Sequence, residues 1–414
     1  MSENYITWAD GYPDIAEGAR EHIPWPCERF ATDLGSISQP VVAKGPDEEL
    51  ITTTWRRAPD EPTHLYNSTD GGKTWSKLSE IPPHWETGPD TQFINTCSGC
   101  GYLKDGTIIV QYMNQFSGGR RPLDPAHDET HRNTTYLVRS TDHGKSWSDP
   151  VALDPWPYQA IGGISRIYES PCGRLYLPMG RRLVAKPGKP LMGEQRETNS
   201  TLYVSENSGQ TWRCWGIMGT CMGENDVLSL DEDRMIAVHR FQRKKLDSDP
   251  ADLVSPMVLN EAHRARKPDC QECRDPKAPG GHSVYKQTAI AFSDNAGRSW
   301  SRPRIVTNWV QQTGCIVQLS DGTLILPFSH KDEGQGQRFI VSYDQGQFWS
   351  KAIFELNKDG MYANSTALKD DTIVTVFSVE SHSGGKNCLE TLRWKAPPKQ
   401  VVSQKGFFKP AAVE

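Results

Sequence analysis

Ser68-Thr-Asp-Gly-Gly-Lys-Thr-Trp75 is the segment that decides the fold, because its pattern Ser-x-Asp-x-Gly-x-x-Trp returns four more times along the chain. The other copies start at Ser140, Ser205, Ser293 and Ser342, and the third and fourth copies have Asn in place of Asp. Each copy follows a short run typical of a β-strand, such as TTYLVR or RFIV. The Asp or Asn side chain can bond the backbone of its own turn, and Gly takes the positive φ that such a turn needs. The repeat therefore predicts hairpin turns covered by Trp, with a structural and not a catalytic role.

A second repeat alternates with the first and consists of a strand, a turn built around Asp or Gly, and another strand. It occurs six times, as VVAKGPDEELITTTW, GYLKDGTIIVQYM, RIYESPCGRLYLPMG, VLSLDEDRMIAVHR, IVQLSDGTLILPF and TALKDDTIVTVFSV. The first five hairpins are followed by a Trp-containing turn, and the sixth by the plain strand CLETLRWK. Four strands in each of six units predict an all-β protein, a six-bladed β-propeller with four-stranded antiparallel blades, as one domain over residues 1–414. We expect the N-terminal segment YITWAD to complete the last blade.

The spacing of the Trp-containing turns is uneven, and the widest interval holds an insertion at about residues 243–285. It is rich in Lys, Arg, Asp and Pro, which predicts a loop, with a short helix at about 257–266. A second long loop covers residues 114–132. Long loops on a rigid scaffold carry binding determinants or form surface excursions, and the sequence leaves both interpretations open.

Composition disfavours several classes of partner. The chain has 46 Lys and Arg against 51 Asp and Glu, with a net charge of −5. The chain has no basic excess that would predict nucleic-acid binding. It also has no basic amphipathic stretch and no long apolar run that would predict a membrane partner. The N-terminus has no signal-peptide pattern, so we expect a cytoplasmic protein, or a secreted one if further sequence precedes residue 1.

Cysteine spacing raises the question of a metal site. Cys97 with Cys100 and Cys270 with Cys273 form two CxxC pairs, which together could make a four-thiolate zinc site. The two pairs are far apart in the sequence, and the first lies in a strand-like segment. We therefore expect buried reduced thiols and a locally paired loop, with no metal and no cofactor.

The hairpin repeat also predicts where a functional site lies. The innermost strand of each propeller blade runs beside the central axis, so residues at one offset before each turn should converge on one funnel. Glu224 stands nine residues before Asp233, and Tyr362 stands nine before Asp371. The same count gives Ser38 before Asp47 and Thr96 before Asp105. We expect Glu224 and Tyr362 to face one pocket from the fourth and sixth blades.

At these residues the chain resembles the sialidase (neuraminidase) superfamily, and the resemblance spans nearly its whole length. CMGENDVLSLDEDRMIAVHR is similar to the segment with the family's catalytic Glu and a following Arg, which implies these roles for Glu224 and Arg240. GMYANSTALKDDTIVTVF resembles the stretch with the Tyr nucleophile, here Tyr362. LILPFSHKDEGQGQRFIVSYDQG resembles the fifth blade and implies that Arg338 binds a carboxylate. TTTWRRAPDEPTHLYNSTDGG resembles the loop of the first blade, in which Asp60 has the acid/base position.

Two positions depart from the family pattern. Gly223 stands where the family often has Asn before its catalytic Glu, and Ser38-Gln39-Pro40 stands where it has Arg-Ile-Pro. The Arg of that motif completes a three-arginine clamp, and losing one such contact to a buried charge costs about 2–5 kcal/mol of binding. The arginines that could replace it are Arg56, Arg57 and Arg166. Otherwise the substrate is a related nonulosonic acid, a uronic acid or a neutral sugar.

The resemblance implies one reaction. A planar guanidinium binds the carboxylate of sialic acid bidentately. That carboxylate would repel an anionic nucleophile, whereas a neutral Tyr can attack once a Glu takes its proton. The chain is thus expected to be a retaining exo-glycosidase that cleaves terminal sialic acid or a related acidic sugar from glycans. Glu224 would be the base for Tyr362, and Asp60 would act first as acid and then as base.

Two other functions fit the same fold. A catalytically silent propeller that binds a glycan or a protein is favoured by the missing arginine and the charged insertions, but it has no need of the Glu224 and Tyr362 pair. A polysaccharide lyase would use Tyr and a basic residue, for which the candidates are His239, His330 and His382. The sequence decides neither the linkage that is cleaved nor the oligomeric state.

Overall fold

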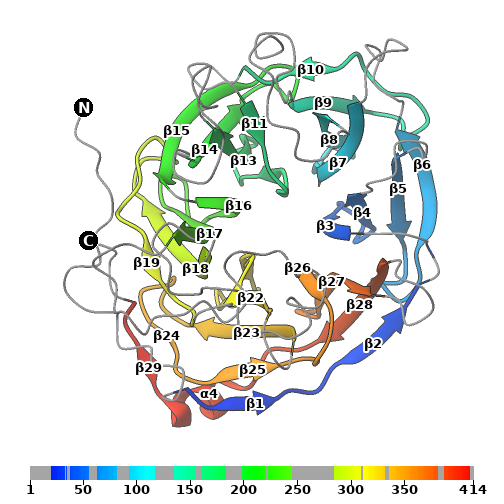
Figure 1. Ribbon diagram of the computed structural model, residues 1–414. Helices are drawn as coiled ribbons and strands as arrows, with labels where there is room; N and C mark the ends of the chain where they lie inside the picture. The colour runs from blue at the N-terminus through cyan, green and yellow to red at the C-terminus, as the bar shows by residue number, and fades with distance from the viewer. Residues whose placement is uncertain are drawn as a thin grey trace, which may run out of the picture.

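The computed structural model is a ring of six blades around a central axis (Figure 1). It describes residues 20–32, 34, 38–55, 63–81, 93–116, 135–154, 160–182, 198–220, 222–244, 284–308, 311–331, 335–380 and 387–410. The protein is a six-bladed β-propeller with four-stranded antiparallel blades, as predicted. Within the described ranges the only helix is α4 (Lys399–Lys405), and no helix there has the length and apolar character needed to span a membrane.

The strands of each blade follow one another from the axis outward. Blade 1 contains β3 (Ser38–Lys44), β4 (Leu50–Trp55), β5 (Thr63–Ser68) and β6 (Ser76–Ile81). Blade 2 contains β7 (Phe93–Tyr102), β8 (Ile108–Phe116), β9 (Thr135–Ser140) and β10 (Val151–Ala152). Blade 3 contains β11 (Ala160–Gly162), β12 (Tyr168–Glu169), β13 (Leu175–Arg182), β14 (Thr198–Ser205) and β15 (Arg213–Thr220). Blade 4 contains β16 (Met222–Ser229), β17 (Met235–Lys244), β18 (Val284–Ser293) and β19 (Arg304–Ile305).

Blades 5 and 6 complete the ring and join the two ends of the described chain. Blade 5 contains β20 (Gln311–Gln312), β21 (Val317–Gln318), β22 (Leu324–His330), β23 (Gly336–Ser342) and β25 (Ile353–Glu355), with β1 (His22–Pro24) parallel to β25. Blade 6 contains β26 (Met361–Ala367), β27 (Ile373–Glu380), β28 (Asn387–Trp394) and the N-terminal β2 (Glu28–Ala31). Near the rim, β24 (Trp349–Ser350) pairs with β29 (Phe407–Phe408).

The N-terminal strand β2 completes blade 6. It pairs antiparallel with β28, with Phe30 opposite Thr391. The segment YITWAD, for which the sequence predicts this role, lies outside the described residues, as do the insertion at 245–283 and most of the loop at 114–132. Apolar side chains between neighbouring blades form the core, where Trp349, Phe339 and Phe354 are fully buried.

The Ser-x-Asp-x-Gly-x-x-Trp turns have the structural role that their sequence predicts. In the first copy, Asp70 Oδ1 accepts hydrogen bonds from the backbone N–H groups of Lys73 and Thr74, both at 3.0 Å. Burial acts to raise the pKa of Asp70, but these bonds and those of neighbouring hydroxyls lower it to about 2. In the third to fifth copies the indole N–H bonds the Gly carbonyl of its own turn. Trp75 instead donates to Thr391 Oγ1 of blade 6 at 2.9 Å, which also joins the two blades.

Candidate functional site

Four residues with an unusual backbone conformation meet at the centre of the ring. Gln39, Glu224, Thr313 and Tyr362 have φ of 54°, 46°, 59° and 60°, and all four line one central pocket. Residues other than glycine rarely adopt positive φ, and such strain is concentrated at functional sites. In blades 1, 4 and 6 the register between the inner strand and its neighbour shifts at this residue. A β-bulge re-aims a side chain, so these irregularities explain how the inner strands present Gln39, Glu224 and Tyr362 to the pocket.

The predicted offset of nine residues holds around the ring, with one adjustment. In blades 1, 3 and 5 the count starts at the turn residue with positive φ, which is Glu48, Gly173 or Gly322. It then reaches Gln39, Ile164 and Thr313, which all line the pocket. The position in blade 1 is therefore Gln39 and not Ser38, because the turn residue equivalent to those of the other blades is Glu48 and not Asp47. In blade 2 the count from Gly106 likewise moves from Thr96 to Cys97, whose side chains lie outside the description.

Glu224 is held by two groups from different blades. Its side chain is 12% exposed, and Arg240 Nη1 donates to its Oε1. Thr313 Oγ1 donates to its Oε2 at 2.7 Å. Arg240 lies on β17 directly opposite Gly223, so the register of the hairpin brings the guanidinium to the carboxylate. The structure thus places together the Glu and the Arg that the sequence assigned to one site.

The charge of Glu224 is stabilised by nearby cations. Burial alone would raise the pKa of Glu224, because a carboxylate loses solvation in the pocket. The positive charges of Arg240, Lys331 and Lys286, with the hydrogen bond from Thr313, more than compensate and hold the pKa below its usual value. Glu224 is therefore ionised at neutral pH.

Tyr362 lies on β26, and an ammonium group rests on its ring. Lys331 Nζ is 3.5 Å from the centroid of the Tyr362 ring, a cation–π contact that lies within the distance typical of such pairs. The bulge that carries Tyr362 is fixed by hydroxyl groups: Ala363 N–H donates to Ser329 Oγ at 3.1 Å. Ser378 Oγ donates to the carbonyl oxygen preceding Tyr362, also at 3.1 Å. The ring is thus held by its backbone and covered by a cation.

Sequence reasoning missed two lysines and a threonine at this site. Lys331 follows the last residue of β22, and Lys286 lies near the start of β18; both are partly buried. The pKa of each is lowered to about 8, chiefly by burial and further by the charge of Arg240. Counting nine back from the turn glycine of the fifth hairpin, Gly322, reaches Thr313, whereas a count from Asp321 reaches Gln312. Neither lysine belongs to a repeated position, so the repeat gives no signal for it.

Comparisons with known proteins agree with the fold. Residues 66–77 match the family model described as BNR/Asp-box repeat. The sialidase of Micromonospora viridifaciens is 24% identical over 364 residues, which cover 79% of this chain and 52% of that protein. The chain therefore spans about half the length of this curated relative. These matches support a BNR-repeat propeller of the sialidase superfamily.

Solved structures show the same fold at lower sequence identity. A protein of unknown function from Dyadobacter fermentans superposes with a TM-score of 0.61 at 16% identity, covering 89% of this chain and 98% of that one. The Trypanosoma rangeli sialidase in complex with the inhibitor DANA superposes with a TM-score of 0.55 at 14% identity, covering 87% of this chain and 55% of that one. These likenesses support the propeller fold.

Arg338 forms an ion pair within the fold, and its role in binding a substrate carboxylate stays a prediction. Its Nη2 is 3.0 Å from Glu355 Oε1 on the outer strand β25, and Glu355 also binds His22 at 2.8 Å.

Arg166, a candidate to replace the missing arginine, is used by the scaffold. Its Nη2 lies 2.8 Å from Asp226 Oδ2 and donates to the Ile316 carbonyl at 3.0 Å, while Nη1 donates to the Ser365 carbonyl at 3.1 Å. These acceptors belong to blades 4, 5 and 6. Arg166 therefore joins the inner segments of four blades at the axis.

The remaining predicted residues are placed as follows. Arg56, Arg57 and Asp60 lie outside the described residues, so their roles stay predictions. Gly223 has room for the family's Asn, since a Cβ there would be 3.8 Å from the nearest atom of Arg240. Lack of space therefore does not explain the departure from the family pattern at this position.

The histidines proposed for a lyase are not presented to the pocket. His239 is fully buried in blade 4, with Nδ1 2.9 Å from Asn225 Oδ1, and burial lowers its pKa to about 3. His330 is also buried and does not line the pocket. His382 lies outside the described residues. A lyase that uses His239 or His330 as its base is therefore disfavoured.

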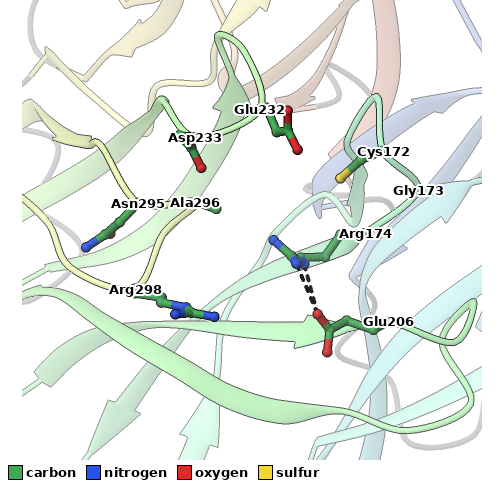
Figure 2. A pocket seen from close by; sticks show the side chains of 9 residues that line it. All are labelled: Cys172, Gly173, Arg174, Glu206, Glu232, Asp233, Asn295, Ala296 and Arg298. Atoms are coloured by element: carbon green, nitrogen blue, oxygen red, sulfur yellow. Dashed lines mark hydrogen bonds and ion pairs between the residues drawn. The ribbon is translucent and has the colours of Figure 1, made fainter.

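A larger cavity of about 520 Å³ lies at the turns of blades 3 and 4, whereas the central pocket measures about 30 Å³ (Figure 2). Its arginines are engaged within the fold: Arg174 donates to Glu206 at 3.1 Å, and Arg174 and Arg298 lie over Trp215. In the described part of the chain no cluster of His, Cys, Asp or Glu could hold a metal ion. The strained backbone and the gathered charges favour the central pocket as the functional site, despite its smaller volume.

Proposed function

We propose that the protein is a retaining exo-glycosidase of the sialidase type, which releases a terminal acidic sugar from glycans. The observation that carries the proposal is that equivalent bulges in blades 4 and 6 present Glu224 and Tyr362 to one pocket. A protein that only binds glycans has no need of a carboxylate and a phenol held in strained conformations at equivalent positions. The sequence relatives named as sialidases support the same interpretation.

In the first step, the Tyr362 oxygen attacks the anomeric carbon and transfers its proton to Glu224. The bond from the anomeric carbon to the leaving oxygen breaks, and Asp60 protonates that oxygen. In the second step, Asp60 takes a proton from water, which attacks the same carbon. The Tyr362 oxygen then leaves and recovers its proton from Glu224. Two displacements at one carbon retain the configuration.

The charges at the site favour the attacking form of the tyrosine. Negative charge develops on the Tyr362 ring as its proton leaves, and the Lys331 ammonium on the ring face stabilises that charge more than it stabilises the neutral phenol. The pKa of Glu224 is below its usual value, so the proton moves to it only as the new carbon–oxygen bond forms. The site thus supports a concerted proton transfer without a free phenolate.

The test is hydrolysis of fluorogenic sialosides and uronosides by the full chain. We expect release of the aglycone by the wild type, and a loss of at least about a hundredfold in kcat for Tyr362→Phe and Glu224→Gln. The control is Lys77→Met on the outer strand β6. A tyrosine control such as Tyr102→Phe is unsuitable because the Tyr102 hydroxyl donates a hydrogen bond to Glu49. A wild type that is inert on both substrate classes contradicts the proposal. An unsaturated product absorbing in the near ultraviolet would instead show lyase chemistry.

A further inference from the structure

The central pocket carries more positive charge than its carboxylate can neutralise. Three cations act on Glu224, namely Arg240, Lys331 and Lys286, and only Arg240 is ion-paired with it. Lys331 Nζ lies 3.5 Å from the ring centroid of Tyr362, and Lys286 lies on β18 opposite Gln242, two residues after Arg240 on β17. In the part of the chain that the structure describes, no ion pair engages either ammonium group, and the carboxylate that acts on both is already bound by Arg240 and Thr313. Counting three cations and one carboxylate leaves a net charge of +2 at the site.

Neighbouring cations do not share this property. Arg166 is paired with Asp226 at 2.8 Å, and Arg338 with Glu355 at 3.0 Å. The two lysines therefore stand apart from the buried arginines around them, which are neutralised within the fold. A partly buried ammonium without a counter-ion is costly, and groups in this condition cluster at ligand sites.

We propose that Lys286 and Lys331, together with Arg240, form the subsite that binds the acidic group of the substrate, in place of the arginine absent at position 38. The ligand is the carboxylate of an acidic monosaccharide, an ulosonic or a uronic acid. This inference rests on the proposed function for the location of the substrate, but it concerns binding and is tested without turnover.

Lysine and arginine bind a carboxylate differently. A guanidinium offers a planar fork that matches a carboxylate in one orientation, whereas an ammonium is a compact charge with three rotatable donors. A subsite built largely from ammonium groups recognises the charge of the sugar more than the plane of its carboxylate. The protein is therefore expected to accept acidic sugars whose carboxylate is attached at different positions, and to exclude neutral sugars.

The substitution also makes recognition depend on pH. Arginine stays charged throughout the alkaline range, but the pKa of both lysines is lowered to about 8. At pH 9 a group with this pKa is charged in roughly one molecule in ten. The affinity for an acidic sugar should then fall by roughly tenfold for each lysine between pH 7 and pH 9, before binding of the anion itself offsets part of the loss.

The experiment measures binding of DANA and of glucuronic acid to the full chain by calorimetry, with glucose as the neutral probe. At pH 7 we expect binding of at least one acidic probe and none of glucose. Lys286→Met and Lys331→Met should each weaken that binding by at least about tenfold, and Lys77→Met should leave it unchanged. Lys331→Arg should bind more tightly than the wild type at pH 9. The thermal midpoint of each variant is recorded to show that it is folded.

The outcomes separate this inference from the proposed function. Acidic probes that bind equally well to the wild type and to both lysine variants overturn the inference, as does a wild type that binds no acidic probe or binds with no change from pH 7 to pH 9. If the lysine variants lose binding while no sialoside or uronoside is hydrolysed, the subsite stands and the proposed hydrolysis fails. If hydrolysis occurs with unaffected lysine variants, the hydrolysis stands and the subsite fails.

Discussion

The residues at the centre of the ring bring conformational and electrostatic costs to the fold. Glu224 and Tyr362 occupy positive φ, which costs on the order of 1–3 kcal/mol for each residue. Lys331 loses solvation without gaining an ion pair in the described part of the chain. Such costs persist when the surrounding structure over-determines them, and here bulged inner strands and serine hydroxyls do so. These residues thus lower the stability of the fold, while the charged groups of the pocket are already in place before a substrate binds.

Replacing Lys331 by Met should therefore stabilise the folded protein at neutral pH. The pKa of Lys331 is about 8 in the folded state and about 10.5 in the unfolded chain. Below pH 8 both states hold the proton, and the full penalty of burying the charge acts against folding. From pH 8 to pH 10.5 the folded state binds fewer protons, so the penalty is progressively relieved. Urea unfolding of Lys331→Met and the wild type should show the larger stability of the variant at pH 7 and a smaller difference at pH 10. A variant that is less stable at pH 7 would contradict this account.

At the scale of elements, the turns contribute stability and the inner strands contribute the site. The third and fourth turns use Asn where the others use Asp, and Asn207 and Asn295 accept the same backbone N–H bonds, at 3.0 and 2.9 Å. The acceptor oxygen, and not the charge, is thus the common requirement of the turn. This equivalence gives a direct comparison of the two residue types at one position.

Asp70→Asn should consequently cost less than Asp70→Ala. Alanine removes the acceptor of two backbone bonds at an exposed turn, with an expected loss of about 1 kcal/mol. The pKa of Asp70 is about 2 when folded and about 3.8 when unfolded, so the carboxylate adds stability above pH 4 that is lost between pH 4 and pH 2. Denaturant midpoints should rank wild type, Asn and Ala in decreasing order at pH 7, and the gap between wild type and Asn should close near pH 2. Equal midpoints for Asn and Ala at pH 7 would refute the role of the acceptor.

The same scale shows how far the sequence could predict the site. Glu224 and Tyr362 could be placed because the hairpin recurs in every blade, and a fixed offset before its turn meets the axis. The ion pair between Arg338 and Glu355 could not be predicted, because Glu355 lies on the outer strand β25 and the pairing has no signature in the repeat. The place of Lys331 at the site could not be predicted for a related reason: it lies just beyond the end of β22, where the path of the chain is set by tertiary contacts. A repeat thus predicts the residues at its repeated positions, whereas single residues at strand ends are identified only from the structure.

For the whole molecule, the problem is to hold separate blades at one axis. Neighbouring blades bury apolar side chains between them, but the pocket end of the axis is lined by polar groups. The Arg166 and Asp226 pair lies two to three residues farther along the inner segments than the bulges, where it binds groups of four blades. Its position beneath the pocket links the stability of the ring to the geometry of the site.

Breaking this pair should destabilise the protein more than breaking a pair at the surface. The side chains of Arg166 and Asp226 are 12% and 3% exposed, so Arg166→Met leaves an unpaired buried carboxylate at an expected cost of about 3–5 kcal/mol. The matched control is Arg234→Met, which breaks the exposed pair with Asp231 and should cost less than about 1 kcal/mol.

Removing both partners tests whether the penalty comes from the charge left behind. In Arg166→Met with Asp226→Leu no buried carboxylate remains at this position, so the double variant should be more stable than Arg166→Met alone. Denaturant unfolding measures the cycle, and binding of an acidic sugar to the double variant reports whether the pocket above keeps its shape. A double variant that is as unstable as the single one would show that Arg166 acts through its hydrogen bonds to the Ile316 and Ser365 carbonyls. Arg166 would then stabilise the ring by connecting blades and not by neutralising the charge of Asp226.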